Sequence, residues 1–210
     1  MPKKPLAALS RVKAMGTIVM KTFLQFHEEA EFLRESSGST NIENTLLKAL
    51  KVFQLFNIPH FVCGGFAVQE HGYPRLTVDV DIIVPDVEFA IERLSMNGFK
   101  ANPGSMTVTD RETKVEINLL PGGKKVDPGP LTFPMPTHVS EKPQILTLER
   151  LISAKLSTYI GVGVHRAQDY ADVVKLIEAN RLPREYGVDL KVRDEYQKIW
   201  DELHQPKDAQ

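Results

Sequence analysis

A pair of glycines and a pair of aspartates constrain this chain more than any other part of its sequence. Gly64 and Gly65, here the glycine pair, follow a short apolar run. Asp79 and Asp81, here the aspartate pair, lie in residues 77–84, where polar and apolar side chains alternate. Side chains two apart on a strand point to the same face, about 7 Å apart along it. The pattern therefore predicts a strand, a glycine turn with a short helix, and a second strand with two carboxylates on one face.

This arrangement indicates chemistry on a nucleotide. Two carboxylates on one strand face are able to share divalent metal ions. A glycine turn that opens a helix offers backbone N–H groups and the positive end of the helix dipole to phosphates. The alternative is a solvated strand face, although aspartate is disfavoured in the middle of a strand. We expect Val78, Val80 and Ile82, which alternate with the aspartate pair, to face the core.

Glu116 is the candidate for a third acid beside the aspartate pair. Two metal ions held about 3.5–4 Å apart need such a further ligand. Residues 114–119 alternate, with aliphatic side chains on one face and Lys114, Glu116 and Asn118 on the other. An adjacent strand would bring Glu116 beside the aspartate pair. The alternative is an ordinary surface residue of a hairpin.

The rest of the chain predicts an α/β (α+β) fold, in which a mixed sheet flanked by helices precedes a C-terminal helical lobe. A capping-box pattern opens a helix at Thr40, and Asp86 would cap another. Helices are expected over residues 19–34, 40–56, 65–70, 87–96, 147–159, 167–180 and 190–203. Strands are expected over 60–63 and 77–84 and in a hairpin of 106–110 and 114–120, with a long Pro- and Gly-rich loop over 121–144. The predicted divisions are a tail and helix over 1–36, a catalytic core over 37–145 and a helical lobe over 146–205.

The composition narrows the class of protein. A net charge of −1 over 210 residues gives no global attraction to nucleic acid. The single cysteine, Cys63, allows no intrachain disulfide and favours a reducing compartment, so we expect a cytoplasmic protein. Cys63 lies in an apolar run and is interpreted as a small core residue rather than a nucleophile. No apolar run approaches the roughly 20 residues that cross a bilayer, so no membrane partner is expected.

The N-terminal segment is basic. Lys and Arg residues precede the first acid, Glu28. This pattern predicts an arm for targeting or for contact with nucleic acid. The alternative is a disordered tail, or a start codon placed too early, since Met15 and Met20 are further candidate starts.

On these residues the chain resembles the nucleotidyltransferase (polymerase β-like) superfamily. The signature of that family is a strand, a Gly-Gly or Gly-Ser turn, an Asp-x-Asp strand and a third acid on a later strand. The matching residues are Gly64, Gly65, Asp79, Asp81 and Glu116. The fuller string, with Gly-Gly-x-Ala, His-Gly and Arg-x-Thr-x-Asp-x-Asp, is most similar to the stand-alone bacterial group that includes the abortive-infection type IV toxin transferases. The resemblance extends over residues 41–180.

The resemblance also implies nucleotide-binding roles for residues outside the signature. Lys155, in a Lys-Leu pair, would approach the triphosphate. Its position on an apolar helix face allows two interpretations, in which it either extends to water or reaches into a site. Arg75 and Thr77 precede the aspartate pair and would contact the nucleotide, with an ion pair to an acid as the alternative for Arg75.

A second family pattern is only partly present. The relatives carry Arg-x-Lys-Asp with a further Asp three residues on. This chain has Arg166, Asp169 and Asp172 at those places, but Gln168 replaces the Lys. Asp169 and Asp172 also suit the N-terminus of a helix electrostatically. The roles of these residues stay open at this point.

The implied activity is the transfer of a nucleoside monophosphate from an NTP to an acceptor hydroxyl, with release of pyrophosphate. Mg²⁺, or Mn²⁺ in its place, would be the cofactor. Asp79, Asp81 and Glu116 would be the catalytic and metal-binding residues, with Glu116 binding the metal on the nucleophile side or taking the acceptor proton. The glycine pair would let the backbone approach the phosphates.

The acceptor stays open among three classes. RNA, in particular a tRNA end, is what the toxin relatives imply. A small molecule such as an aminoglycoside or lincosamide antibiotic would need an acidic pocket, for which Asp110, Glu112 and Glu116 are candidates. A protein side chain is the third. A non-catalytic nucleotide-binding or antitoxin-like module, with a toxin–antitoxin partner, is the alternative to an enzyme; the intact Asp, Asp and Glu set favours the enzyme.

Overall fold

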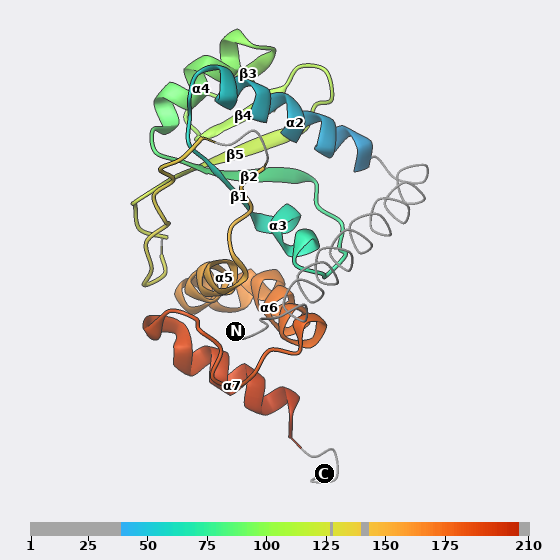
Figure 1. The fold of residues 1–210 in the computed structure, drawn as a ribbon, viewed down its shortest axis with the longest axis vertical. Coiled ribbons are helices and arrows are strands. Elements are labelled where there is room, and N and C mark those ends of the chain that lie inside the picture. The colour runs from blue at the N-terminus through green and yellow to red at the C-terminus, as the bar shows by residue number, and fades with distance from the viewer. Residues whose placement is uncertain (1–38, 127, 140–142, 206–210) are drawn as a thin grey trace, which may run out of the picture. The chain divides into compact units, whose positions relative to one another are not determined.

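The computed structural model describes residues 39–126, 128–139 and 143–205 (Figure 1). The chain divides into two compact units, Met1–Glu43 and Asn44–Gln210, and the features discussed below lie in the second, apart from the first residues of one helix. The predicted helix over 19–34, the basic N-terminal arm and the division over 1–36 lie outside the described residues.

A five-stranded mixed sheet lies in the second unit. Its strands are ordered β1-β2-β5-β4-β3. β2 and β5 are parallel neighbours, and the other neighbouring pairs are antiparallel. The strands are β1 (Phe61–Cys63), β2 (Asp79–Val84), β3 (Phe99–Ala101), β4 (Thr107–Asp110) and β5 (Glu116–Pro121). The predicted mixed sheet is confirmed, and the strand with the aspartate pair lies between β1 and β5.

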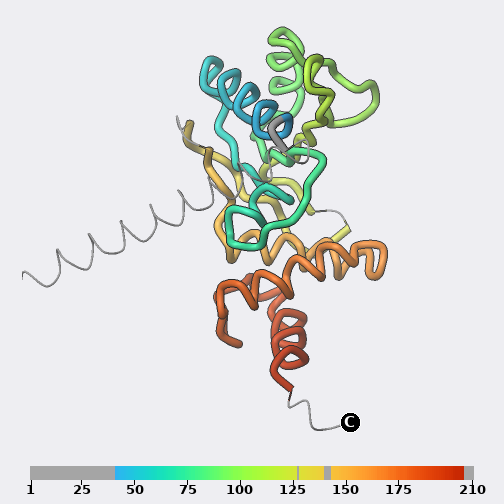
Figure 2. The backbone as a smooth tube through the Cα atoms, turned by 90° about the vertical axis from the view of Figure 1, so that its right-hand side faces the viewer, coloured from blue at the N-terminus to red at the C-terminus, as the bar shows by residue number. Residues whose placement is uncertain are grey.

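Helices flank the sheet, and a helical region follows it in the chain (Figure 1). The helices are α2 (Ser39–Leu55), α3 (Gly64–Glu70), α4 (Val87–Met96), α5 (Leu148–Val162), α6 (Ala167–Asn180) and α7 (Arg193–Leu203), with 3₁₀ turns η1 (Gly163–Arg166) and η2 (Leu190–Val192). The Phe89 amide donates to Asp86 Oδ1 at 2.9 Å, which confirms the predicted cap of α4. α5, α6 and α7 lie together, with α5 next to α3 (Figure 2). No helix in the described ranges is both long and apolar enough to cross a membrane.

Two predicted details of the sheet are wrong. β2 begins at Asp79 rather than at residue 77, and Val78 is 82% exposed instead of facing the core. The physical reason is that the pairing of β2 with β5 starts at Asp79 opposite Glu116, so Val78 has no neighbouring strand to hold it. Strand β3 was not expected because it is only three residues long; it forms by antiparallel pairing with β4 and buries Phe99.

One apolar core connects the glycine turn with the C-terminal helices. Cys63 and Ala67, at either end of the turn into α3, belong to the same cluster as Ile152, Leu156 and Tyr196. Full burial of an aliphatic side chain stabilises a fold by about 1.5–3 kcal/mol, so this cluster holds the turn firmly against α5. The core includes residues from both sides of the predicted boundary between a catalytic core and a helical lobe, and that boundary stays a prediction.

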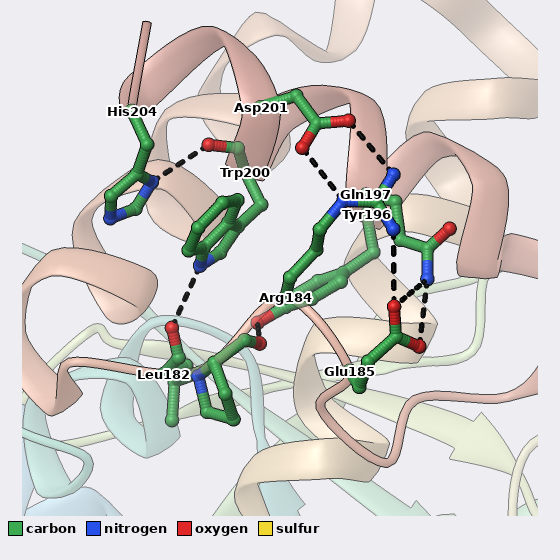
Figure 3. Close-up of polar contacts among 9 residues, drawn as sticks. Leu182, Arg184, Glu185, Tyr196, Gln197, Trp200, Asp201 and His204 are labelled. Carbon is green, nitrogen blue, oxygen red and sulfur yellow. Dashed lines mark hydrogen bonds and ion pairs between the residues drawn. The ribbon is translucent and has the colours of Figure 1, made fainter.

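The segment between α6 and α7 is tied back onto α7 (Figure 3). The Trp200 indole N–H donates to the Leu182 carbonyl at 2.9 Å, and the Tyr196 hydroxyl donates to the Pro183 carbonyl at 2.9 Å. Beside them, Arg184 forms a two-point ion pair with Asp201 at 2.7 and 2.9 Å. Ion pairs at exposed positions contribute little to stability. The two aromatic side chains, which bind backbone carbonyls, therefore hold this segment.

We expect the fold to lose stability as the pH falls below about 6.5, because of His60. Its ring is 1% exposed and lies beside Phe53, and burial lowers its pKa below the ordinary value. The unfolded chain therefore binds more protons than the folded chain below about pH 6.5, and protonation favours unfolding. Urea unfolding above and below this pH should show a smaller loss for His60→Leu than for the wild type. An equal loss in both proteins would contradict the assignment.

Candidate functional site

The aspartate pair lies on β2 with one amide group between its two carboxylates. Asp79 and Asp81 are half-buried, while Val80 and Ile82 are fully buried, as the alternation predicts. Asn118 Nδ2 donates to Asp79 Oδ2 at 3.0 Å and to Asp81 Oδ1 at 2.9 Å. One amide therefore holds both carboxylates on the same face of the sheet.

Asn118 is the residue of this site that sequence reasoning missed. It lies on β5, the parallel neighbour of β2, in register with Asp81. The available signal was the alternation that places Asn118 on the same face as Glu116. A search for metal ligands favours carboxylates, although amide oxygens also bind hard cations.

β5 also brings Glu116 to the face of the aspartate pair, in register with Asp79. The Glu116 carboxylate accepts hydrogen bonds from Asn102 Nδ2 at 2.9 Å and from Thr107 Oγ1 at 3.3 Å. These two contacts hold it toward β4 and leave it exposed. Within the part of the chain that the structure describes, no three His, Cys, Asp or Glu side chains form a group able to hold a metal ion. The role of Glu116 as a metal ligand stays a prediction.

Cross-strand pairing extends this polar face across the sheet. Directly opposite residues on paired strands have their side chains on the same face. One row consists of Asp81, Asn118 and Thr107, and the next of Asp79, Glu116, Thr109 and Lys100. We call these seven residues the polar strip. It carries three carboxylates at or beside the aspartate pair and one ammonium group at its outer end.

Asp110 does not belong to this strip. It follows Thr109 on β4 and therefore points to the opposite face of the sheet. Its carboxylate is buried and lies 2.7 Å from Lys48 Nζ. Glu112 is exposed, with its carboxylate 4.0 Å from the same ammonium group. Of the three acids expected to line an acidic pocket, only Glu116 thus lies on the face of the aspartate pair.

Side chains of the site approach both glycines closely. Gly64 has a φ of +63°, and a Cβ there would lie 1.7 Å from Asp81 Oδ2. A Cβ at Gly65 would lie 2.5 Å from Thr77 Oγ1 and 3.0 Å from Arg75 Nη2. The glycine pair therefore packs directly against the aspartate pair and against the loop that precedes it. No other residue type fits at these two positions without displacing those side chains.

Thr77 and Arg75 lie in the loop between α3 and β2. The Thr77 hydroxyl is 3.3 Å from both the backbone carbonyl and Oδ1 of Asp79. Arg75 Nε lies 2.9 Å from Asp172 Oδ1, and the Arg75 carbonyl accepts a hydrogen bond from the Gln69 side chain. In this structure Arg75 thus pairs with an acid, which is one of the two interpretations of its position in the sequence.

Lys155 is buried among carboxylates at the start of α6. Its side chain is 7% exposed, and Nζ lies 2.9 Å from Asp169 Oδ1 and 2.6 Å from Asp172 Oδ2. Gln168 Nε2 donates to Asp172 Oδ1 at 2.8 Å. Lys155 therefore does not extend to water. Together with Arg75 these groups form what we call the ion cluster, Arg75, Lys155, Asp169 and Asp172, with two cations and two anions.

Burial raises the pKa values of two neighbouring side chains, Asp81 and Cys63. Burial raises the pKa of Asp81 above its ordinary value, the hydrogen bond from Asn118 opposes this rise, and the charge of Asp79 adds to it. Burial also raises the pKa of Cys63 well above its ordinary value, and Asp81 contributes in the same direction. Cys63 is 5% exposed and is therefore a neutral core thiol.

The donor set of the aspartate pair fits a hard divalent cation. Both carboxylates are half-buried and share one neutral amide as their common donor. Burial disfavours the charged form of Asp81 and so raises its pKa, and a cation bound beside it would favour the charged form. Carboxylate and amide oxygens are the ligands that Mg²⁺ prefers.

Comparison with solved structures finds distant likenesses, of which one is described here. No protein-family model matches the chain, and no curated protein has a significantly similar sequence. One similar structure is the solution structure of the antibiotic-resistance factor ANT(2'')-Ia, which is described as having substrate-regulated conformation dynamics. The structural alignment covers 80% of this chain and 94% of that chain. The sequence identity is 11% and the TM-score is 0.48. At this degree of similarity we base no conclusion on the likeness.

We expect Gly64→Ala to destabilise the protein more than Gly104→Ala. Both glycines have positive φ, +63° and +75°, so alanine adds roughly 1–2 kcal/mol of backbone strain at each position. Only at Gly64 does the new Cβ also collide with Asp81, whereas a Cβ at Gly104 meets nothing within 4 Å. Displacing a packed group adds about 1–3 kcal/mol, which the free energies of urea unfolding would reveal. Equal losses for the two variants would contradict the close approach of Asp81 to the turn.

Proposed function

We propose that this chain is a Mg²⁺-dependent nucleotidyltransferase, which transfers a nucleoside monophosphate from an NTP to an acceptor hydroxyl and releases pyrophosphate. One observation carries the proposal: the aspartate pair is held by a single amide and lies directly against the glycine pair. The resemblance of the sequence to the nucleotidyltransferase superfamily rests on the same residues. The arrangement brings candidate metal ligands and a tight backbone turn together at one place on the sheet.

Each group of residues has a distinct part in this reaction. Asp79 and Asp81 would hold Mg²⁺, or Mn²⁺ in its place. When bound, the metal neutralises charge that develops on the phosphates. Asn118 and Thr77 orient the two carboxylates by hydrogen bonds. The glycine pair allows the backbone to approach the nucleotide without a Cβ in the way.

Glu116 would take the proton of the acceptor hydroxyl. The acceptor oxygen forms a bond to the α-phosphorus, the bond from that phosphorus to the bridging oxygen breaks, and pyrophosphate leaves. The proton released by the acceptor would pass to Glu116, which is exposed and is held one strand away from the aspartate pair by Asn102 and Thr107. We favour this role over metal ligation because the Glu116 carboxylate faces β4.

The polar strip favours a small neutral or cationic acceptor that carries hydroxyl groups. Its three carboxylates, with a single lysine at the outer end, would repel the phosphates of RNA. Amide and hydroxyl side chains on the strip suit a hydroxyl-rich molecule through hydrogen bonds. RNA acceptors, protein acceptors and an antitoxin partner are the competing possibilities that an acceptor assay would test.

We expect Asp79→Ala and Asp81→Ala to lose Mg²⁺-dependent binding of NTP. The measurement is a thermal shift with each of the four NTPs, with and without Mg²⁺. A ligand that binds only the folded state stabilises it by about 2.7 kcal/mol at a hundredfold excess over its dissociation constant. Asp194→Ala, which removes an exposed acid on α7, is the matched control.

Two results would contradict the proposal that this chain is a nucleotidyltransferase. Intact transfer of nucleotide by Asp79→Ala would show that the aspartate pair is not the catalytic centre. Nucleotide binding that is independent of Mg²⁺, without transfer to any hydroxyl acceptor, would favour the non-catalytic binding module instead.

We expect Glu116→Gln to lower kcat by about 10²–10⁴-fold while NTP binding is kept. The reason is that the amide cannot accept the acceptor proton, although it has nearly the shape of the carboxylate. Glu112→Gln on the same hairpin is the control, because Glu112 is exposed and lies away from the polar strip. A loss of Mg²⁺-dependent NTP binding in Glu116→Gln would assign Glu116 to the metal instead.

A further inference from the structure

Asn102, which directly follows β3, lies at the centre of a hydrogen-bond network beside the polar strip. Its Nδ2 donates to Glu116 Oε2 at 2.9 Å and lies 2.7 Å from Thr107 Oγ1 and 3.1 Å from Thr109 Oγ1. The Thr109 hydroxyl donates to Asn102 Oδ1 at 3.3 Å. Both polar atoms of this half-buried amide therefore have partners, which fix the side chain in one orientation.

The hydrogen bonds to Glu116 come from the side of β5 that is away from Asp79. Glu116 lies opposite Asp79 in the parallel ladder of β2 and β5, whereas β4 and β3 follow on the other side of β5. Asn102 and Thr107 bind the carboxylate from there, and both bonds end on Oε2. Neighbouring strands are only about 4.8 Å apart, so a glutamate side chain is long enough to reach either neighbour. The hydrogen bonds therefore decide which neighbour Glu116 faces.

The same network accounts for the arrangement of acids at the aspartate pair. No group of three His, Cys, Asp or Glu side chains among the described residues is able to hold a metal ion, although the strand register puts Glu116 beside Asp79. The direct partner of both aspartates is instead the amide of Asn118. Strand pairing thus brings a third carboxylate to this place, and hydrogen bonding turns it away.

We propose that Asn102 is a positioning residue that keeps Glu116 away from the metal and so leaves this acid free to take the acceptor proton. The inference rests on the proposed function and adds to it the residue that separates two metal ligands from one base. A carboxylate bound to a divalent cation is a poor base, because the cation favours its charged form. Since Asn102 and Thr107 both bind Oε2, Oε1 is the oxygen that accepts the proton.

Removal of the amide should let Glu116 join the metal ligands. The experiment measures the binding of Mn²⁺ alone to the full chain, from the electron paramagnetic resonance signal of the free ion, without nucleotide or acceptor. Asn102→Ala should bind Mn²⁺ about tenfold more tightly than the wild type, because a third carboxylate raises the charge of the ligand set. The double variant Asn102→Ala/Glu116→Gln should lose this gain. A purely structural role of Asn102 would not raise the affinity through Glu116.

Two variants of the same turn complete the test. Ser105→Ala is the matched control, because the Ser105 hydroxyl donates to the Asn102 carbonyl at 3.1 Å and lies 3.0 Å from Thr107 Oγ1 but does not bind Glu116. Its affinity for Mn²⁺ should equal that of the wild type. Thr107→Val keeps the shape of the side chain and removes the longer bond to Glu116, so it should give a smaller gain. If Asn102→Ala does not fold, Thr107→Val decides.

Any of three results would overturn the inference. They are an unchanged or weaker affinity for Mn²⁺ in a folded Asn102→Ala variant, a gain that survives Glu116→Gln, and an equal gain in Ser105→Ala. Failure of the proposed function gives a different result, in which Asp79→Ala and Asp81→Ala bind Mn²⁺ as the wild type does. If these two variants lose Mn²⁺ while Asn102→Ala shows no gain, the metal site stands and the role of Asn102 alone is rejected.

Discussion

The parallel ladder between β2 and β5 is the constraint on which the candidate site depends. It aligns Asp79 with Glu116 and Asp81 with Asn118, two residues from a strand more than thirty positions away. A slip of one residue would turn every side chain of one strand to the other face of the sheet. Buried Ile82 and its register partner Leu119 oppose such a slip, because it would expose them to water. The hydrophobic face therefore sets the geometry of the polar one.

Charges are distributed unequally between the two halves of the site. The aspartate pair has neutral direct partners, the amide of Asn118 and the hydroxyl of Thr77. The cations Arg75 and Lys155 are instead paired within the ion cluster, whose charges balance. The sheet thus keeps an uncompensated negative charge that suits a divalent cation, while the nearby positive charge is already paired. This imbalance is the physical basis for the metal site that we propose at the aspartate pair.

Three kinds of contact connect the loop before β2, the glycine turn and the C-terminal helices. Arg75 binds Asp172 of α6, the glycine pair packs against the loop's side chains, and Cys63 and Ala67 share a core with α5. Thr77, which contacts Asp79, lies in the same loop. The position of α6 is therefore linked to the aspartate pair through a short chain of direct contacts. A change at Asp172 would reach the sheet by this route.

Much of the local structure was predictable from the sequence, because helix and strand periodicities, caps and turns depend on residues close together in the chain. The alternation at the aspartate pair, the hairpin, the cap at Asp86 and the inner face with Lys155 are of this kind. The sequence pattern did not predict features that depend on a neighbour far away in the chain. Val78 is exposed because no strand pairs with it. Asn118 is the direct hydrogen-bond partner of both aspartates.

By itself the sequence determined which side chains share a face of one element, and so which residues were candidates for chemistry. Only the tertiary structure decided which candidates meet. It directed Glu116 toward Asn102, and it paired Arg75 and Lys155 with Asp172. The physical reason is that hydrogen bonds and ion pairs act over a few ångström, whereas the residues they join lie far apart along the chain. Their partners are therefore set by how the strands and helices pack.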